Sequence, residues 1–582
     1  MITKKWELAP PAPSSLLRQY QQVSPIIAQL LYNRGMETPQ EAYHFLYDRD
    51  VASTAGDPRH MKDMPKAISR LTDAIKRNES IVIYGDFDAD GVTSTTLMMD
   101  VLTRLGANVQ AYIPHRVDEG YGLNTPALQE IAEQGAKLVV TVDCGIRSVQ
   151  EVEDAHAAGL DMIITDHHSV GPEIPPALAV VNPQQADCRG DTAIAGVGVA
   201  FMTMRAMLLD ALDRNGKQKK HAQKYKKLLD SLLDLVAIGT VADVMPLNTP
   251  TNRALVRKGL EVINTAQRPG IRALMDVAGL KRGQVTAMGI GFGLGPRINA
   301  AGRLDSALEA YHLLSSTSDD EAKKYADRLQ HLNQRRQQLT RESQQRIRDR
   351  LEEEGVLDDS QLLFAVDDHV SPGIVGLVAG RLTEEFYRPT IVVERGEDEC
   401  HASCRSIPHF HITQALDECA DLLVRHGGHA MAAGLTVLPK NLPQLQERLQ
   451  EKAHAVLDGL SLRPIIEIDM ELPMRDVNMD LANELTVLEP TGHANEAAVF
   501  LSRNLEVIEA RTVGSDGAHL KVKLAGDGEP AIDGIGFRLG HWLNDLPSHI
   551  DVVYNLEVNE WLGRRNLQLN LRDLRPAGET TL

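Results

Sequence analysis

The stretch Ile81–Ser94, IVIYGDFDADGVTS, decides the fold of this chain. It opens on three β-branched residues, which predict a buried strand, and it continues into aspartates at alternate positions: Asp86, Asp88 and Asp90. Alternate residues of an extended backbone face the same way, so these carboxylates are expected together at the carboxyl end of a parallel strand. Clustered carboxylates repel one another unless a cation lies among them, which favours metal binding. The alternative is an Asp-rich turn that caps a helix beginning near Val92.

Two further buried strands end in the same kinds of side chain. Lys137–Val142 is followed by Asp143 and Cys144, and Asp161–Thr165 is followed by Asp166, His167 and His168. A fourth segment, Leu235–Leu247, carries Asp243 among apolar and small residues. Because these ligand types gather at four successive element ends, the chain predicts a dinuclear metal site on a parallel sheet. The alternative for the two histidines is one buried, hydrogen-bonded ring beside an exposed one.

Length and composition narrow the class of protein. At 582 residues the chain is too long for one core, and three or four domains are expected. A hydrophobic content of 43% and a charged content of 24% are those of a soluble globular protein, and no apolar run reaches membrane-spanning length. Five cysteines at irregular spacings form no disulfide framework, so we expect a reducing, cytoplasmic location and no membrane partner.

The net charge of −19 places any binding of nucleic acid on local basic patches rather than on the whole surface. Two runs of basic residues, Lys217–Lys227 and Arg335–Arg350, are candidates, although solvated helix faces explain both more simply. The run Ala195–Leu212 opens on alternating glycines, which predict a closely packed helix start rather than a phosphate loop.

The order of patterns predicts an α/β protein of several domains. We expect an N-terminal segment, 1–55, that packs on a catalytic domain, 56–316, in which strands and helices alternate. A polar helix free of Gly and Pro, 317–357, then leads to a second α/β domain at 358–460. Five or six short strands between Ile465 and Leu571 predict an oligonucleotide-binding barrel at 461–582.

Six segments resemble a known family. GDFDADG, TVDCGI, TDHH and GTVADVMPL resemble the four motifs of the DHH phosphoesterase superfamily. GPRINAAGRLD (295–305) and GGHAMAAGL (427–435) are similar to its RecJ branch, whose members are single-strand-specific 5′ to 3′ DNA exonucleases. The resemblance covers nearly the whole chain in the family order. It implies a DHH catalytic domain, a DHH-associated domain after the long helix, and hydrolysis of single-stranded DNA to nucleoside 5′-monophosphates in recombination and mismatch repair.

The resemblance also assigns a role to each metal-site residue. Asp143 would bridge two divalent ions, Mn²⁺ or Mg²⁺, with Asp88 on one ion and Asp90, His167 and Asp243 on the other. Asp86 would either bind a metal or orient the loop, and His168 would flank the ligands as a further catalytic residue. Asp166 would accept a ring N–H from one of the two histidines. The bridging role predicts that Asp143→Ala abolishes turnover and leaves the fold intact.

The resemblance also implies substrate-binding roles for individual residues of this chain. The phosphate-contacting positions that match are Arg116, Arg297 and, more weakly, Arg303. HASCRSI (401–407) resembles the family's GSGRS loop, which holds the 5′ end of the strand, with Ser403 and Arg405 matching; His429 would face the cleft. The alternative is that each arginine is a surface charge. The chain departs from the family at three places: Cys144 where Asn is common, Val370-Ser371 in place of Trp-His, and a weak entry to the barrel at 489–499.

Other functions stay open on the sequence alone. One alternative is a DHH-family phosphoesterase of short oligoribonucleotides or nucleotide phosphates, and another is a non-catalytic scaffold. A zinc site is a third, on the spacing of Cys400, Cys404, His409 and His411. For the exonuclease, we expect a monomer whose substrate is single-stranded DNA with a free 5′ end, and the candidate protein partners are a helicase and a single-strand-binding protein.

Overall fold

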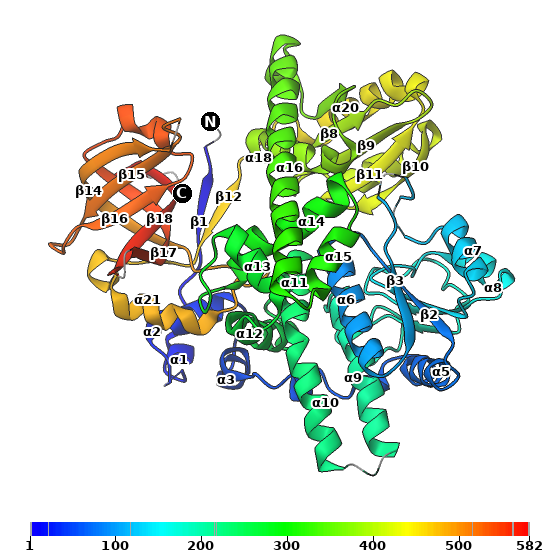
Figure 1. Cartoon of the computed structure of the whole chain (residues 1–582). Helices are drawn as coiled ribbons and strands as arrows, with labels where there is room; N and C mark the ends of the chain where they lie inside the picture. The colour runs from blue at the N-terminus through cyan, green and yellow to red at the C-terminus, as the bar shows by residue number, and fades with distance from the viewer. Residues whose placement is uncertain are drawn as a thin grey trace. The chain divides into compact units, whose positions relative to one another are not determined.

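The computed structural model describes residues 3–579, apart from 21, 117, 121, 215, 217, 515, 562 and 563, and apart from the side chains of 358 and 561. The chain divides into two compact units (Figure 1). The central unit spans Arg49–Leu462, and the terminal unit combines the residues up to Asp48 with those from Arg463 onward. No helix among the residues described is both long enough and apolar enough to cross a membrane.

A parallel sheet of strand order β3-β2-β4-β5-β6 organises the first part of the central unit. Alternation in β2 sends Ile81 and Ile83 to one face and Val82 and Tyr84 to the other, and both faces are buried. The strands are β2 Ser80–Gly85, β3 Asn108–Tyr112, β4 Leu138–Val142, β5 Asp161–Thr165 and β6 Ala179–Val181.

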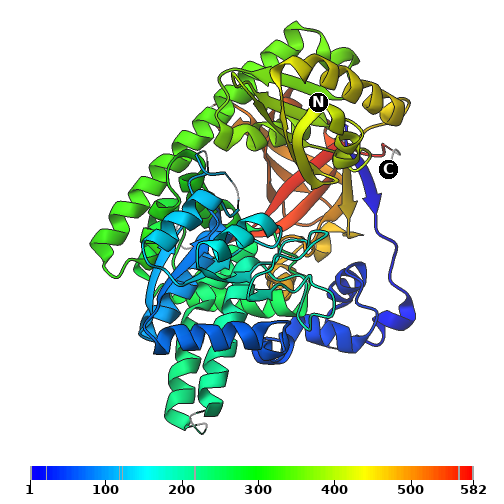
Figure 2. The ribbon, with the colours of Figure 1, turned by 90° about the vertical axis from the view of Figure 1, so that its right-hand side faces the viewer.

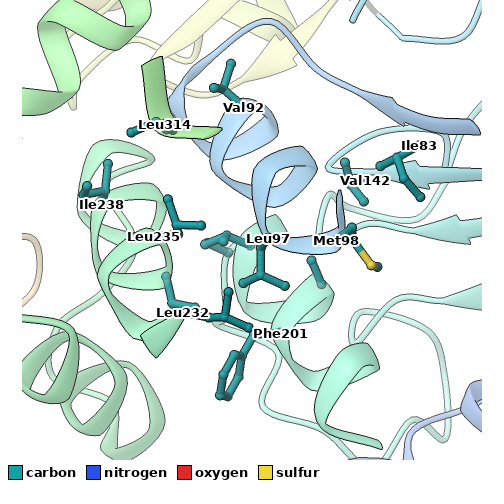
Figure 3. Packing of buried hydrophobic residues seen from close by; sticks show 14 of the residues in the cluster. Ile83, Val92, Leu97, Met98, Val142, Phe201, Leu232, Leu235, Ile238 and Leu314 are labelled. Atoms are coloured by element: carbon teal, nitrogen blue, oxygen red, sulfur yellow. The ribbon is translucent and has the colours of Figure 1, made fainter. Parts of the chain in front are cut away.

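Helices cover both faces of this sheet. On one side α7 and α8 contribute Leu128, Ile131 and Val152, and on the other α5, α6, α9 and α11 form the larger core. Figure 3 shows Leu97 and Met98 of α6 among Phe201 of α9 and Leu235 of α11. The helices are α4 Val51–Thr54, α5 Met64–Lys76, α6 Ala89–Arg104, α7 Thr125–Glu133, α8 Val149–Ala157, α9 Gly196–Arg214, α10 Lys219–Ser231, α11 Leu233–Ala242, α12 Pro250–Thr265, α13 Pro269–Ala278, α14 Gly295–Leu304 and α15 Leu308–Ser315.

Helices α9 and α10 extend away from the sheet as a pair (Figures 1 and 2). The predicted lysine cluster lies on α10, which has no buried residue, so its described part is a solvated helix; Lys217 lies outside the described residues. A π-helix, Gly289–Leu294, runs directly into α14.

The long helix, α16 Asp319–Glu353, joins the sheet domain to the second α/β domain. It is more than a spacer, because Ala326 and Leu329 belong to the first core while Ile347 and Leu351 belong to the second. The second sheet has the order β10-β11-β9-β8-β7. Its elements are α17 Val356–Asp359, β7 Leu363–Asp367, α18 Val375–Phe386, β8 Thr390–Glu394, β9 Cys400–Arg405, α19 Ile412–Asp417, β10 Leu423–His429, β11 Ala432–Val437 and α20 Leu442–Leu457.

The terminal unit contains a closed five-stranded barrel. Strand β14 pairs with both β15 and β17, and β16 and β18 complete the ring. The predicted barrel is therefore confirmed, with longer strands than the sequence indicated. Its elements are β12 Ile465–Ile468, β13 Met470–Glu471, α21 Met479–Leu485, β14 Phe500–Val513, β15 His519–Ala525, β16 Ile532–Gly536, β17 His549–Trp561 and β18 Arg564–Pro576.

The N-terminal segment is divided between the two units. We predicted that residues 1–55 pack on the catalytic domain; the residues up to Asp48 cluster with the terminal unit, whereas 49–55 belong to the central unit. Strand β1 (Lys5–Leu8) pairs in parallel with β12, so β12 does not join the barrel sheet. Helices α1 (Ser14–Leu17), α2 (Pro25–Asn33) and α3 (Pro39–Tyr47) share the barrel's apolar core, contributing Leu30 and Phe45. This pairing joins segments too distant in sequence for local periodicity to detect.

Candidate metal centre

The turn after β2 divides the three aspartates of the opening stretch. Helix α6 begins at Ala89 rather than near Val92, and Asp88 is its N-cap, accepting hydrogen bonds from the backbone N–H groups of Asp90 (2.9 Å) and Gly91 (3.1 Å). The three carboxylates therefore do not share one extended face. Asp86 and Asp88 lie with Asp143, while Asp90 lies with His167 and Asp243. The capping interpretation is confirmed, and it is compatible with metal binding, because the capping aspartate is also a potential ligand.

Asp90 is held by the N-terminus of α9. Its two carboxylate oxygens accept hydrogen bonds from the backbone N–H groups of Gly196 (2.6 Å) and Val197 (2.9 Å), a favourable position for an anion. A Cβ at Gly196 would lie 2.5 Å from Asp143 Oδ1, so only glycine fits there. This confirms the prediction that the glycines at this helix start serve close packing.

Asp143 follows β4 in a left-handed conformation, with φ of 63°, which Asp and Asn tolerate better than most residues. Its side chain is 2% exposed, and its Oδ1 lies 3.1 Å from His167 Nε2. The same oxygen lies 3.9 Å from His168 Nδ1. Asp143 belongs to a group with Asp86 and Asp88 and to another with the two histidines, so it lies between two clusters of potential ligands.

His167 and His168 have different hydrogen-bond partners and different pKa shifts. Asp166 Oδ1 accepts a hydrogen bond from His168 Nδ1 at 2.8 Å, which shows which ring this carboxylate contacts. Burial alone would lower the pKa of His168, but Asp166 raises it to about 9. His167 instead hydrogen-bonds to the Ile194 backbone, and its Nε2 has no hydrogen-bond partner among the described residues. Burial and the positive His168 lower the pKa of His167 to about 4, so its ring is neutral, as a metal ligand requires.

Asp243 completes the second group from the end of α11. The fourth motif is a helix end rather than a strand end, since Asp243 is the C-cap residue of Leu233–Ala242. Its Oδ2 lies 3.5 Å from His167 Nε2, and Asp90 Oδ2 lies 3.8 Å from the same nitrogen. Burial and the neighbouring carboxylates Asp90 and Asp88 raise the pKa of Asp243 to about 8.

The donor set fits divalent cations. Buried Oδ1 atoms of Asp86 and Asp143 and Nε2 of His167 have no hydrogen-bond partner within the described parts of the chain. Burial and mutual repulsion raise the pKa of Asp86 and Asp143 well above the usual range and that of Asp90 to about 7. Unpaired buried acceptors that point at one another are strongly unfavourable without positive charge between them. Oxygen ligands with one imidazole suit Mn²⁺ and Mg²⁺.

Arg116 and Arg303 adjoin these carboxylates. Arg116 lies over the ring of Phe87, 4.7 Å from its centroid. Its guanidinium group interacts electrostatically with the carboxylates of Asp86 and Asp88. Burial and the positive charges of Arg116, Arg336 and Arg405 lower the pKa of Arg303 to about 10. Arg297 donates to Gln330 Oε1 (2.8 Å) and to the Gly293 carbonyl (2.7 Å).

Two residues of this region were missed by the sequence reasoning. Arg336 lies in a basic run that we interpreted as a solvated helix face, yet its Nε is buried without a hydrogen-bond partner in the described chain, and it feels the charge of Arg297. Asn299, in the GPRINAAGR segment, accepts a hydrogen bond from the Ala89 backbone N–H at 2.7 Å and so holds the start of α6. Only the spacing of Asn299 from two candidate arginines could have signalled it.

The second domain presents Ser403 and Arg405 toward the start of α18. Arg405 Nη1 donates to Ser403 Oγ at 3.2 Å, and a Cβ at Gly376 would lie 3.0 Å from both Ser403 Oγ and Arg405 Nη2. Arg303 Nη1 donates to the Gly373 carbonyl at 3.0 Å, so the first domain reaches the same place. His429 is exposed, and it lies in one row of the sheet with Ala432 and Arg405, hence on the same face.

The zinc alternative gains no support. Cys400 and Cys404 point into the apolar core of the second domain, and burial raises the pKa of Cys404 to about 12. His409 and His411 are exposed, and no group of three potential ligands among the described residues includes any of the four. Cys144, which replaces the expected Asn, is also buried, with its Sγ 3.8 Å from the Tyr84 carbonyl.

Comparisons with known proteins agree with this layout. Residues 80–240 match the DHH family, N-terminal domain, residues 359–455 match the DHHA1 domain, and residues 468–573 match the RecJ OB domain. The single-stranded-DNA-specific exonuclease RecJ of Bacillus subtilis is 37% identical over 98% of this chain and 70% of its own. Its counterpart in Escherichia coli is 34% identical over 95% of this chain and 96% of its own.

Solved structures extend the similarity to the fold. The crystal structure of RecJ from Thermus thermophilus in complex with Mn²⁺ is similar over 98% of this chain and 79% of that chain, with a TM-score of 0.82 and 28% identity. The same protein in complex with Mg²⁺ gives a TM-score of 0.76 and 27% identity over 98% of this chain and 78% of that chain.

Proposed function

The chain belongs to the RecJ family of single-stranded-DNA-specific exonucleases, and from this membership we propose that it removes nucleotides from the 5′ end of single-stranded DNA with two divalent metal ions. The observation that carries the proposal is a pair of adjoining ligand groups, one with Asp143 after β4 and the other with His167 after β5, whose Oδ1 and Nε2 atoms lie 3.1 Å apart. One group would hold one cation through Asp86, Asp88 and Asp143. The other would hold the second through Asp90, His167 and Asp243.

The chain's own residues prepare this site for hydrolysis of a phosphodiester. Divalent cations bound there would lower the pKa of water and neutralise the charge of the phosphate. His167 stays neutral and directs Nε2 at the carboxylates, while Asp166 fixes the orientation of His168. The N-terminus of α9 and the N-cap geometry of α6 fix Asp90 and Asp88, so the ligands are positioned before the substrate arrives.

Recognition of the 5′ end would come from the second domain. Ser403, Arg405 and the first turn of α18 converge on one place, where Arg303 of the first domain also arrives. A helix N-terminus with arginine and hydroxyl donors is suited to a phosphate. Arg116, Arg297 and Arg336 would bind the phosphates nearer the metal centre. A site assembled from two domains would admit one strand, and a duplex would be too wide to enter it.

The rival activity on short oligoribonucleotides or nucleotide phosphates has less support. Residues 468–573 match the RecJ OB domain, and a small substrate does not need a barrel of that kind. All five cysteines are free thiols, which supports our expectation that the protein works in a reducing cytoplasm. Action as a monomer, with a helicase and a single-strand-binding protein as partners in recombination and mismatch repair, completes the proposal.

One gel tests the proposal. Purified protein with Mn²⁺ would be given a 5′-labelled single strand, its 3′-labelled twin and a blunt duplex, with Asp143→Asn as the inactive control. We expect immediate labelled mononucleotide from the first, progressive shortening of the second, and an intact duplex. Intact long strands together with rapid loss of di- to tetranucleotides would establish the small-substrate activity instead.

A further inference from the structure

A strongly exposed aromatic side chain lies on the π-helix that precedes α14. Phe292 is 82% exposed, more than any other large apolar side chain in the described regions. It is not an isolated surface residue, since Met288, one turn earlier, is 56% exposed. Grouped apolar side chains that face water mark interaction sites. π-Helices are rare in proteins, and those that occur are often found at functional sites.

This apolar group adjoins the metal centre. A Cβ at Gly291 would lie 3.8 Å from Val241 Cγ1, and one at Gly295 would lie 3.2 Å from Ala242 Cβ, so the π-helix packs on the last turn of α11. That turn ends at Asp243, a predicted ligand. The next residue, Val244, is 63% exposed and has a left-handed φ of 56°, an unfavourable conformation for a β-branched residue. We call Val244, Met288 and Phe292, the exposed apolar side chains of these two adjoining elements, the apolar ledge.

Guanidinium groups continue the ledge. Arg297 follows Phe292 by five residues, and its Nη1 donates to the Gly293 carbonyl in the π-helix. The charge of Arg297 acts on Arg336 of α16, and neither forms a salt bridge within the described chain. An exposed aromatic ring beside unneutralised arginines is the combination with which proteins bind single strands, because bases stack on the ring while phosphates contact the cations.

We propose that Phe292 is a stacking platform for a base near the 5′ end of the substrate strand, with Val244 and Met288 as its apolar border. The inference rests on the proposed function. It adds a contact that sets the position of the strand relative to the metal centre and tolerates every base, because each base has a π-face. Phe292 is therefore a positioning residue and does not take part in the chemistry.

Abasic substitution identifies such a contact. Binding of a 3′-labelled single strand would be measured by fluorescence anisotropy in EDTA, so that the strand stays intact, with an abasic nucleotide at each of the first eight positions in turn. For the wild-type protein we expect one or two adjacent abasic positions to weaken binding about tenfold. For Phe292→Ala, the intact strand should bind about tenfold more weakly, and the same abasic positions should have no further effect.

Three further variants complete the test. Phe292→Trp should restore the wild-type abasic profile, Phe292→Leu should behave like Phe292→Ala, and Tyr43→Ala, a 54% exposed aromatic in the terminal unit, should behave like wild type. A Phe292→Ala protein that keeps the wild-type affinity or abasic profile would overturn the inference. So would a Leu variant that restores affinity, which would indicate a general apolar contact with the strand rather than stacking of a base on the ring. Absence of wild-type binding to any single strand would refute the proposed function itself.

Discussion

Asp143 shows how much a single backbone conformation decides in this site. Its left-handed φ turns the carboxylate back over the end of β4, where it meets His167. Alanine in that conformation adds backbone strain, whereas asparagine tolerates it and keeps the side-chain volume. Asp143→Asn is therefore a cleaner test of the bridge than the alanine variant predicted from the sequence.

For Asp143→Asn we expect turnover to fall by more than ~100-fold, because residues that only orient a ligand already cost 10–100-fold when removed. Without metal, the melting temperature should equal or exceed that of the wild type, since one of several repelling buried carboxylates is gone. The rise in melting temperature on adding Mn²⁺ should shrink. Single-turnover assays and thermal melts in EDTA and in Mn²⁺ measure these effects. Wild-type turnover in this variant would remove the bridge assignment.

Gly376 offers a second test at the scale of one atom. A methyl group there would lie 3.0 Å from Ser403 Oγ and Arg405 Nη2, so Gly376→Ala should displace both from a bound 5′ phosphate. We expect the preference for 5′-phosphorylated over 5′-hydroxyl strands to fall about tenfold, as measured by initial rates. Gly380→Ala, on the same helix but 3.9 Å from the nearest atom, is the control and should keep the preference. Equal preferences in the two variants would exclude a phosphate at this place.

At the residue scale, the sequence indicated the candidate ligands that the structure brings together, but not their surroundings. Asp86, Asp88, Asp143 and His167 could be found because each follows a short buried strand, a local pattern. Asn299, Arg336 and Phe292 could not, because their importance depends on which side of a helix meets another element. For the same reason, Arg336 was taken for a solvated residue in a basic run.

At the scale of elements, a buried carboxylate anchors α16 to the second α/β domain in addition to its apolar contacts there. Arg346 donates two hydrogen bonds of 2.9 Å to Asp367 at the end of β7, and Asp367 also accepts from the His369 backbone N–H. Burial alone would raise the pKa of Asp367, but these hydrogen bonds and the charge of Arg346 hold it below its ordinary value of 3.8. The polar sequence of α16 predicted a helix correctly, but it did not reveal this anchor, because the partner lies in another element.

The lowered pKa fixes the sign of a pH effect. A carboxylate whose pKa is lower in the folded state stabilises the protein above its unfolded pKa, and this contribution is lost as the pH falls through the folded pKa. Asp367→Asn should therefore lower the free energy of unfolding at pH 7 by on the order of 2 kcal/mol, and the difference should shrink below pH ~4. Urea denaturation across this range measures it. Asp368→Asn, whose ion pair with Arg395 is exposed, should change stability by less than ~0.5 kcal/mol. A pH-independent difference for Asp367→Asn would contradict the ion-pair explanation.

At the scale of the whole molecule, an acidic protein must bind an acidic polymer. Because the net charge is −19, we propose that binding depends on the guanidinium groups of Arg116, Arg297, Arg303, Arg336 and Arg405. Such local binding is steeply sensitive to salt, because each phosphate contact releases counterions.

Salt titration distinguishes arginines that bind phosphate from those that face water. For single strands, log K falls with log salt with a slope of about −0.7 per phosphate contact. Arg336→Ala should make the slope about 0.7 shallower, whereas Arg335→Ala, an exposed neighbour on the same helix, should leave it unchanged. Anisotropy titrations between about 50 and about 300 mM KCl, on either side of physiological ionic strength, measure the slopes of both variants. Identical slopes for the two variants would show that Arg336 does not contact phosphate and is a solvated residue of the helix.

The pairing of β1 with β12 has a consequence during synthesis on the ribosome. Lys5 faces Ile465, so β1 leaves the exit tunnel long before its partner strand, which is made after the whole central unit. At 5–20 residues per second, the roughly 460 residues from Lys5 to Ile465 delay that partner by about 23–92 s. During this time Trp6, Leu30 and Leu31 have no core to enter, while the nuclease domains can already fold. The apolar side chains of the N-terminal segment therefore stay without the core that they share in the folded protein until the residues from Arg463 onward have been made.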